Sequence, residues 1–182
     1  MIDNMFTFLK QRKPEKENWA SVKEFEERNM DINEVLEMDD ADCLVTEMRT
    51  RIYNKCDYGS CVEKLSEAEM VFYLTVELEG EVMNGGFGQF FDNSSGNFAN
   101  ETEAALRRIG AEKTADIYKK ALDALGGELP RDRKERWKAL EERETEAVSA
   151  LLAKCDGDFY KEDDDLNALL YDYVMKNKEQ FE

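Results

Sequence analysis

The 182-residue sequence has no histidine, two prolines and four cysteines, and each scarcity argues against a class of protein. Without histidine, the chain lacks the commonest general base and a common zinc ligand. With two prolines and ten glycines, it lacks the turn residues that a sandwich of many short strands needs. No apolar run approaches the roughly 18 to 20 residues that cross a bilayer. These absences favour a helical protein without a membrane span.

Neither the cysteines nor the acidic pairs match a metal-binding pattern. The cysteines have no paired CxxC spacing and are expected to be free thiols of a cytoplasmic protein; they are Cys43, Cys56, Cys61 and Cys155. Asp156 and Asp158 begin like a calcium loop, but Tyr160 stands where the third acidic ligand is needed. The apolar run at residues 5–9 is too short for a secretory signal, and its basic residues follow it. We expect no metal and no cofactor.

Positive charge is also scarce, with 25 Lys and Arg against 42 Asp and Glu, which gives a net charge of −17. Such a chain repels nucleic acid, whose backbone is a dense line of negative charge, and it repels anionic membrane surfaces. A basic protein surface is therefore the expected partner. The same charge also keeps a protein soluble, so the total alone does not separate these two roles.

Apolar residues recur at helical spacing along most of the chain, and no segment alternates like a half-buried strand. The sequence predicts a single compact all-α domain of about seven to nine helices over residues 18–182. Residues 1–17 precede this domain as an N-terminal extension that ends in a basic stretch, and residues 18–28 form the first expected helix.

Capping patterns mark where several helices begin. Ser66 with Glu69 opens a central helix that runs to about residue 83. The same spacing of cap and glutamate predicts helix starts at Asp31, Asn100 and Asp132. Leucines and a tyrosine at helical spacing define a last helix from residue 166 to 174. The predicted core consists of Phe72, Leu74, Leu78, Val82, Phe87, Phe90, Phe91, Leu106, Ile109, Leu122, Trp137, Leu169, Leu170 and Tyr173.

The most distinctive stretch of the chain is residues 84–96, NGGFGQFFDNSSG, which combines glycines, phenylalanines and amides. Gly85 and Gly86 follow a long apolar run and predict a helix stop. Phe87, Phe90 and Phe91 predict a short buried helix at once, and residues 93–96 predict a second stop. The stretch is either a tight structural joint or a site lined by amides. Its site residues would be Glu81, Asn84, Gly85, Gly86, Phe87, Gln89, Phe90, Phe91, Asn93 and Gly96.

The pattern NGGF-x-QFF-x-NSSG, preceded by Glu79 and Glu81, resembles that of the bacterial DNA-mimic protein family. The resemblance continues through Phe159 and Tyr160 to the last helix and covers roughly residues 65 to 182. It implies a small, acidic, all-helical fold. It also implies an acidic decoy that occupies the DNA-binding surface of a regulator, and it is compatible with a homodimer. Much of the family has no known function.

Two acidic concentrations offer surfaces for a basic partner. The candidate partner-binding residues are Asp39, Asp40, Asp42, Glu141, Glu142, Glu144, Glu146, Asp163, Asp164 and Asp165. Residues four apart on one helix rise about 6 Å along its axis, close to the roughly 6.8 Å of two phosphate steps on a DNA strand. Glu142 and Glu146 have that separation if one helix carries both. Asp163 to Asp165 are equally suited to cap the last helix.

Two other functions share these features. One is an enzyme or ligand-binding domain at the joint, where Glu77 and Glu81 share a helix face and could act as paired carboxylates. No phosphate loop, dinucleotide fingerprint or serine elbow accompanies them, which favours a protein without catalytic activity. The other is an immunity protein or antitoxin, which would use the same acidic surface against a basic toxin.

Overall fold

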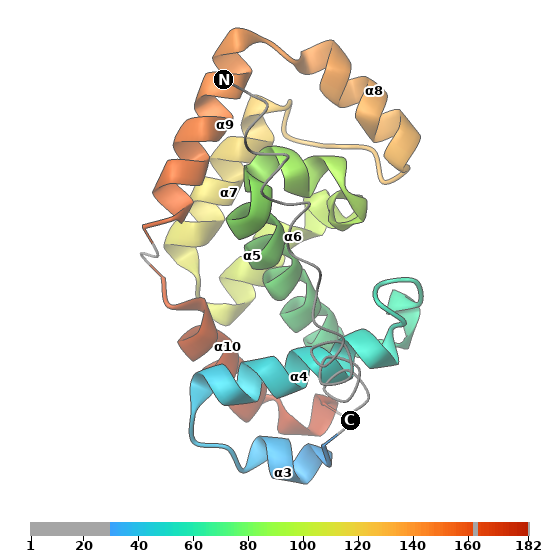
Figure 1. Ribbon diagram of the computed structural model, residues 1–182, viewed down its shortest axis with the longest axis vertical. Helices are drawn as coiled ribbons and strands as arrows, with labels where there is room; N and C mark the ends of the chain where they lie inside the picture. The colour runs from blue at the N-terminus through green and yellow to red at the C-terminus, as the bar shows by residue number, and fades with distance from the viewer. Residues whose placement is uncertain (1–29, 162–163, 182) are drawn as a thin grey trace, which may run out of the picture.

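The computed structural model describes residues 30–161 and 164–181 (Figure 1). Across these residues the chain forms eight α-helices, three short 3₁₀ helices and no strand, so the all-α prediction is confirmed. The predicted extension at residues 1–17, the predicted helix at 18–28 and Asp163 lie outside the described residues. None of the described helices combines the length and hydropathy that spanning a bilayer requires.

The helices follow one another with short connections. In chain order they are α3 (Ile32–Leu36), α4 (Ala41–Lys55), α5 (Glu67–Asp92), α6 (Ala99–Ile109), α7 (Glu112–Ala124), α8 (Arg133–Arg143), α9 (Glu146–Phe159) and α10 (Leu166–Lys176). The 3₁₀ helices are η1 (Val62–Lys64), η2 (Ser94–Phe98) and η3 (Lys178–Gln180). Helix α5 runs through the middle of the molecule, while α8 stands apart at one end (Figure 1).

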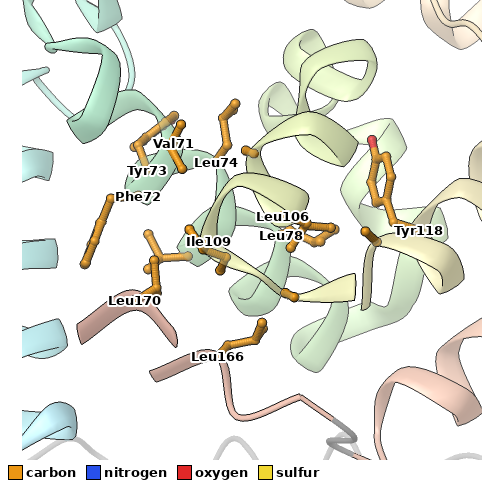
Figure 2. Packing of buried hydrophobic residues seen from close by; sticks show 14 of the residues in the cluster. Val71, Phe72, Tyr73, Leu74, Leu78, Leu106, Ile109, Tyr118, Leu166 and Leu170 are labelled. Atoms are coloured by element: carbon orange, nitrogen blue, oxygen red, sulfur yellow. The ribbon is translucent and has the colours of Figure 1, made fainter. Parts of the chain in front are cut away.

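Helix α5 begins at the predicted capping box. The Glu69 N–H donates to Ser66 Oγ at 3.1 Å, and the Ser66 N–H donates to Glu69 Oε2 at 2.8 Å. Beyond this cap the helix is apolar on most sides, so α4, α6, α9 and α10 can all pack against it. Figure 2 shows Leu78 of α5, Leu106 of α6 and Leu170 of α10 as members of one buried cluster. The nearly continuous apolar run at residues 70–76 is thus that of a buried helix, as the cap predicted.

One predicted helix start and one predicted capping box need correction. Helix α6 begins at Ala99, and Asn100 is not its cap. The Asn100 amide instead donates to the Leu129 carbonyl at 2.9 Å and accepts from the Leu129 N–H at 3.0 Å. It therefore fastens the loop before α8 to α6. Asp31 does cap α3, but its carboxylate binds the Asn33 amide groups rather than forming a reciprocal pair with Glu34.

The predicted core is confirmed except at two positions. Trp137 is 44% exposed, because the indole lies over the end of α5 and not inside the bundle. Leu169 is half-buried at the edge of the core. The remaining predicted core residues are buried in one continuous cluster.

Arg136 of α8 is the largest fully buried side chain of the described residues, and the sequence did not suggest it. Its guanidinium donates five hydrogen bonds of 2.7 to 3.0 Å, to the carbonyls of Phe91, Pro130, Arg131 and Asn93 and to Asn97 Oδ1. All five N–H groups of the guanidinium are therefore used. Arg136 satisfies carbonyls at the end of α5 and joins α8 to that end.

Gly96 makes room for this guanidinium. A Cβ at that position would lie 2.8 Å from Arg136 Nε and 2.5 Å from the Phe91 carbonyl oxygen. The last glycine of the distinctive stretch is therefore required by the close approach of the Phe91 carbonyl and of the arginine.

We expect Arg136→Lys to lower the free energy of unfolding by about 3 kcal/mol or more, because an ammonium has three donors and leaves buried carbonyls unsatisfied. Urea denaturation measures the loss. The control is Arg133→Lys on the same helix, where the exposed side chain donates to the Asp92 carbonyl, and we expect a loss within about 1 kcal/mol. Equal losses in the two variants would contradict a structural role for the guanidinium fork.

Candidate functional site

The distinctive stretch forms a sharp break within α5. Gly85 has φ −157° and ψ 20°, and Gly86 has φ +78° and ψ 179°, so neither residue is helical. The helix before the break and the short helix from Phe87 to Asp92 therefore have different directions, as the two glycines predicted. A positive φ at Gly86 is a conformation that glycine adopts without a steric penalty.

Helix α9 clamps both sides of this break. Asp156 Oδ1 accepts a 2.7 Å hydrogen bond from the Phe87 N–H, the first donor of the short helix. Tyr160 Oη donates a 3.0 Å hydrogen bond to the Val82 carbonyl, at the end of the preceding helix. A Cβ at Gly86 would lie 2.6 Å from Asp156 Oδ2, so glycine also lets the carboxylate approach. Asp156 is thus a helix cap supplied from 69 residues away.

The phenylalanines after the break turn into the core. Phe87, Phe90 and Phe91 are buried, and each ring lies 5.8 to 6.1 Å from the ring of Tyr118. The Tyr118 hydroxyl donates to the Ala99 carbonyl at 2.6 Å, and burial raises the pKa of this phenol. These aromatics form a packed cluster in the core.

The polar residues of the stretch converge on Glu81. Its carboxylate accepts hydrogen bonds from Gln89 Nε2 at 2.6 Å and from Asn93 Nδ2 at 2.9 and 3.1 Å, with Ser95 Oγ at 3.4 Å. Glu81 precedes the break, and the three donors follow it. The carboxylate therefore ties the two helical segments together, which favours the structural interpretation of these amides.

A surface hollow of about 350 Å³ lies beside this network, lined by Tyr53, Val76, Glu77, Gly80, Glu81, Asn84, Gln89 and Asn93. Glu77 accepts a 2.6 Å hydrogen bond from Tyr53 Oη. Burial raises the pKa of Glu77, and the neighbouring charge of Glu81 adds to this effect. The hollow brings the predicted site residues Glu81, Asn84, Gln89 and Asn93 together, and its use as a ligand site stays a prediction.

Several predicted partner-binding carboxylates accept hydrogen bonds from within the fold. Asp40 caps α4, and the Cys43 N–H lowers the pKa of its carboxyl. Asp165 caps α10. Asp164 accepts hydrogen bonds from the Thr114 N–H and hydroxyl at 2.8 and 3.0 Å.

Helices α4 and α10 bring two of these acidic segments together. Asp42 accepts from Asn167 Nδ2 at 2.7 Å, while Asp39 is exposed. Asp42, Asp164 and Asp165 line one pocket of about 350 Å³. Among the residues that the structure describes, no group of three or more acidic or cysteine side chains is arranged to hold a metal ion.

The four glutamates Glu141, Glu142, Glu144 and Glu146 lie at the corner between α8 and α9, and all four are exposed. We call this set the α8–α9 corner. The phosphate-like spacing of Glu142 and Glu146 requires one helix to carry both residues. The structure does not meet this condition, because α8 ends at Arg143 and α9 begins at Glu146. Thr145 caps the new helix, so these carboxylates belong to two helices of different direction.

Two residues that organise this region carry no recognisable signal in the sequence. In the sequence, Asp156 stands out only as part of an incomplete calcium pattern, and Arg136 is one basic residue on a charged helix. Their partners lie 69 and up to 45 residues away in sequence. The signal in the sequence is the pair Gly85 and Gly86 before Phe87. A helix that restarts at a buried residue has an unpaired backbone N–H, which needs an acceptor from another part of the chain.

We expect Asp156→Ala to lower the free energy of unfolding by about 1 to 2 kcal/mol, because the Phe87 N–H loses its cap. The matched control is Asp158→Ala, two residues along the same helix, where the carboxylate makes a surface pair with Lys161. That change should cost no more than about 0.5 kcal/mol. Thermal and urea unfolding of both variants measure the difference, and similar losses would exclude the clamp.

We expect Glu77→Gln to raise the free energy of unfolding near neutral pH. The raised pKa of Glu77 means that its ionised form costs stability above the ordinary value of 4.5, and that this cost disappears as Glu77 becomes protonated below it. The gain of the variant should therefore shrink as the pH falls toward about 4. Glu63→Gln removes an exposed charge and serves as the control. A gain for Glu77→Gln that matches the control at every pH would contradict the prediction.

Comparison with known proteins relates the described helices to one family. The family model for DMP19-like protein matches residues 63–177, which is more than half of the chain and runs from η1 to the end of α10. The match includes the break in α5 with its clamp and the α8–α9 corner. No curated protein and no solved structure matches the chain. This chain belongs to the DMP19-like protein family.

Proposed function

We propose that this chain is a non-enzymatic interaction protein and a DNA mimic. It occupies the basic DNA-binding surface of a transcriptional regulator or of another nucleic-acid-binding protein. Membership of the DMP19-like family supports this proposal, and so does a net charge of −17. A protein with such a charge attracts the same surfaces that attract DNA phosphates.

The observation that carries the proposal is the exposure of the carboxylates at the α8–α9 corner. Within the described parts of the chain, the single salt bridge of this set joins Glu142 to Lys138, at 3.8 Å. Such an exposed pair contributes little and leaves the charge accessible. The corner carboxylates are therefore available to a partner, whereas Asp156 and Asp164 are engaged by the fold.

The basic residue inside this stretch does not neutralise the corner. Arg143 Nη1 donates to the carbonyls of Leu125 and Glu128, near the end of α7. Its positive charge thus lies at the C-terminal end of α7, where it interacts favourably with the negative end of the helix dipole. The glutamates on either side of Arg143 keep their charge for solvent or for a partner.

Electrostatic decoys have a physical signature. Complementary charge accelerates encounter and is screened by salt, since the Debye length falls from about 10 Å at 0.1 M to about 3 Å at 1 M. Binding through the corner should therefore weaken steeply with salt and compete with DNA. An enzyme at the joint is favoured less, because the Glu81 carboxylate already accepts from three side chains.

The test uses the natural chain to capture proteins from a lysate of the source cells, followed by mobility-shift assays of each captured protein on DNA. We expect the natural chain to release the DNA, and the release to fall by about tenfold or more when the four corner glutamates become glutamine. The control variant changes four other exposed glutamates, Glu34, Glu37, Glu63 and Glu179, to glutamine and should keep its activity.

The two variants have the same net charge, so the comparison separates a local surface from the total charge. Equal release by both variants would contradict a role for the corner. Tight binding that persists at about 0.5 M salt would contradict the phosphate-decoy mechanism.

A further inference from the structure

A mainly apolar groove of about 400 Å³ lies between α8, α9 and the short helix after the break in α5. Its apolar walls include Trp137 and Leu140 of α8 and Val148 and Leu152 of α9. We call it the α8–α9 groove. The two helices are joined at the α8–α9 corner and diverge from it (Figure 1). The groove lies directly beside the carboxylates that carry the proposed function.

Trp137 is a rigid, partly exposed wall of this groove. The indole Nε1 donates to the Asp92 carbonyl at 2.9 Å, and the Arg133 guanidinium lies 4.7 Å from the ring centroid. The ring is therefore held from two sides while 44% of the residue stays exposed. A large aromatic side chain whose orientation is already fixed can bind a partner with little further loss of conformational entropy.

Gly88 keeps the groove open. It belongs to the short helix after the break, and a Cβ at this position would meet no atom within 4 Å. Glycine is a poor helix former, and here neither a positive φ nor a close neighbour requires it. The effect of the missing side chain is free space in the groove.

The rim of the groove is acidic. Asp92, Glu141 and Glu144 line it, and none of its lining residues is basic. An anionic occupant, such as nucleic acid or an acidic lipid surface, is disfavoured by these carboxylates. An apolar side chain with lysine or arginine on either side is complementary to the apolar walls and to the rim.

We propose that the α8–α9 groove binds an apolar side chain presented by a lysine- or arginine-rich amphipathic helix of a protein partner. This inference rests on the proposed function and assigns its anchoring contact. The corner carboxylates attract the basic segment over a distance, and the groove then holds one of its apolar residues. Charge sets the rate of encounter, whereas a buried apolar contact lengthens the lifetime of a complex.

The probe is a synthetic peptide of about 18 residues made of leucine, lysine and alanine, with leucine at the helical spacing i, i+3, i+4 and i+7. The receptor is the full chain with Trp19→Phe, so that Trp137 is its single tryptophan and can be excited selectively. We expect saturable binding with a shift of Trp137 emission to shorter wavelength. A peptide with alanine in place of each leucine should bind at least about tenfold more weakly, although its charge is unchanged.

Two pairs of variants separate the groove from its surroundings. Gly88→Leu fills the groove with a side chain. Gly157→Leu adds the same side chain on α9, at a position that does not line the groove and where a Cβ also meets no atom within 4 Å. We expect Gly88→Leu to weaken binding at least about tenfold and Gly157→Leu to leave it unchanged. Circular dichroism and thermal unfolding verify that both variants keep the fold.

The second pair tests the rim. Changing Glu141 and Glu144 to glutamine removes two rim charges, and changing Glu142 and Glu146 to glutamine removes two corner charges that do not line the groove. The first change should weaken binding of the peptide more than the second. Equal affinities for Gly88→Leu and Gly157→Leu, or for the leucine and alanine peptides, would overturn the proposal.

Other outcomes identify a different occupant. If the natural chain sediments as a dimer that Gly88→Leu dissociates, and the peptide does not bind, the groove is an interface between two copies and the proposal is wrong.

The groove and the proposed function can also fail separately. Suppose that Gly88→Leu abolishes peptide binding but still makes the captured protein release its DNA. The proposed function is then supported, and only the anchoring role of the groove is overturned. If neither charge variant affects DNA release and the peptide still binds in the groove, the proposed function fails and the groove remains a peptide site.

Discussion

The hydrogen bond from the Phe87 N–H to Asp156 is the interaction on which the arrangement of this protein depends. A helix that breaks beside the core leaves unpaired donors on one side of the break and unpaired acceptors on the other, and the buried ones need partners. Asp156 and Tyr160, one turn apart at the end of α9, supply one acceptor and one donor across the break. Without them, the Phe87 N–H and the Val82 carbonyl, which belong to buried residues, would lose these partners.

The break determines where α8 can lie. After it, the short helix ends at Asp92, and Arg136 binds the carbonyls of Phe91 and Asn93 that this ending leaves. Helix α8 is thereby fastened through its first half, while its second half leads to the α8–α9 corner, where α9 begins. This arrangement leaves an apolar groove and an acidic rim on the surface and does not bury them. The surface proposed for binding is a consequence of the joint that the distinctive stretch encodes.

Local patterns were enough to predict most of the helices, because caps and glycine stops act within one turn. Ser66 and Asp132 each begin a helix where the sequence indicated, and Gly85 and Gly86 break one. Tertiary contacts decided the rest. Trp137 is a large aromatic residue of the type expected in a core, yet its indole N–H donates a hydrogen bond to the Asp92 carbonyl at the surface. Asn100 matches a cap, but it binds the backbone of Leu129, which no local pattern reveals.

The acidic residues show why a charge total cannot identify a binding surface. A carboxylate that accepts hydrogen bonds from backbone or side-chain donors contributes to folding, and its donors can come from distant elements. Asp42 is bound by Asn167, 125 residues away, and Asp164 by Thr114, 50 residues away. The corner glutamates have no such donors among the described residues, and the nearby Arg143 is directed toward α7. Charge that the fold does not use is charge that a partner can use, and in this chain it lies beside the groove.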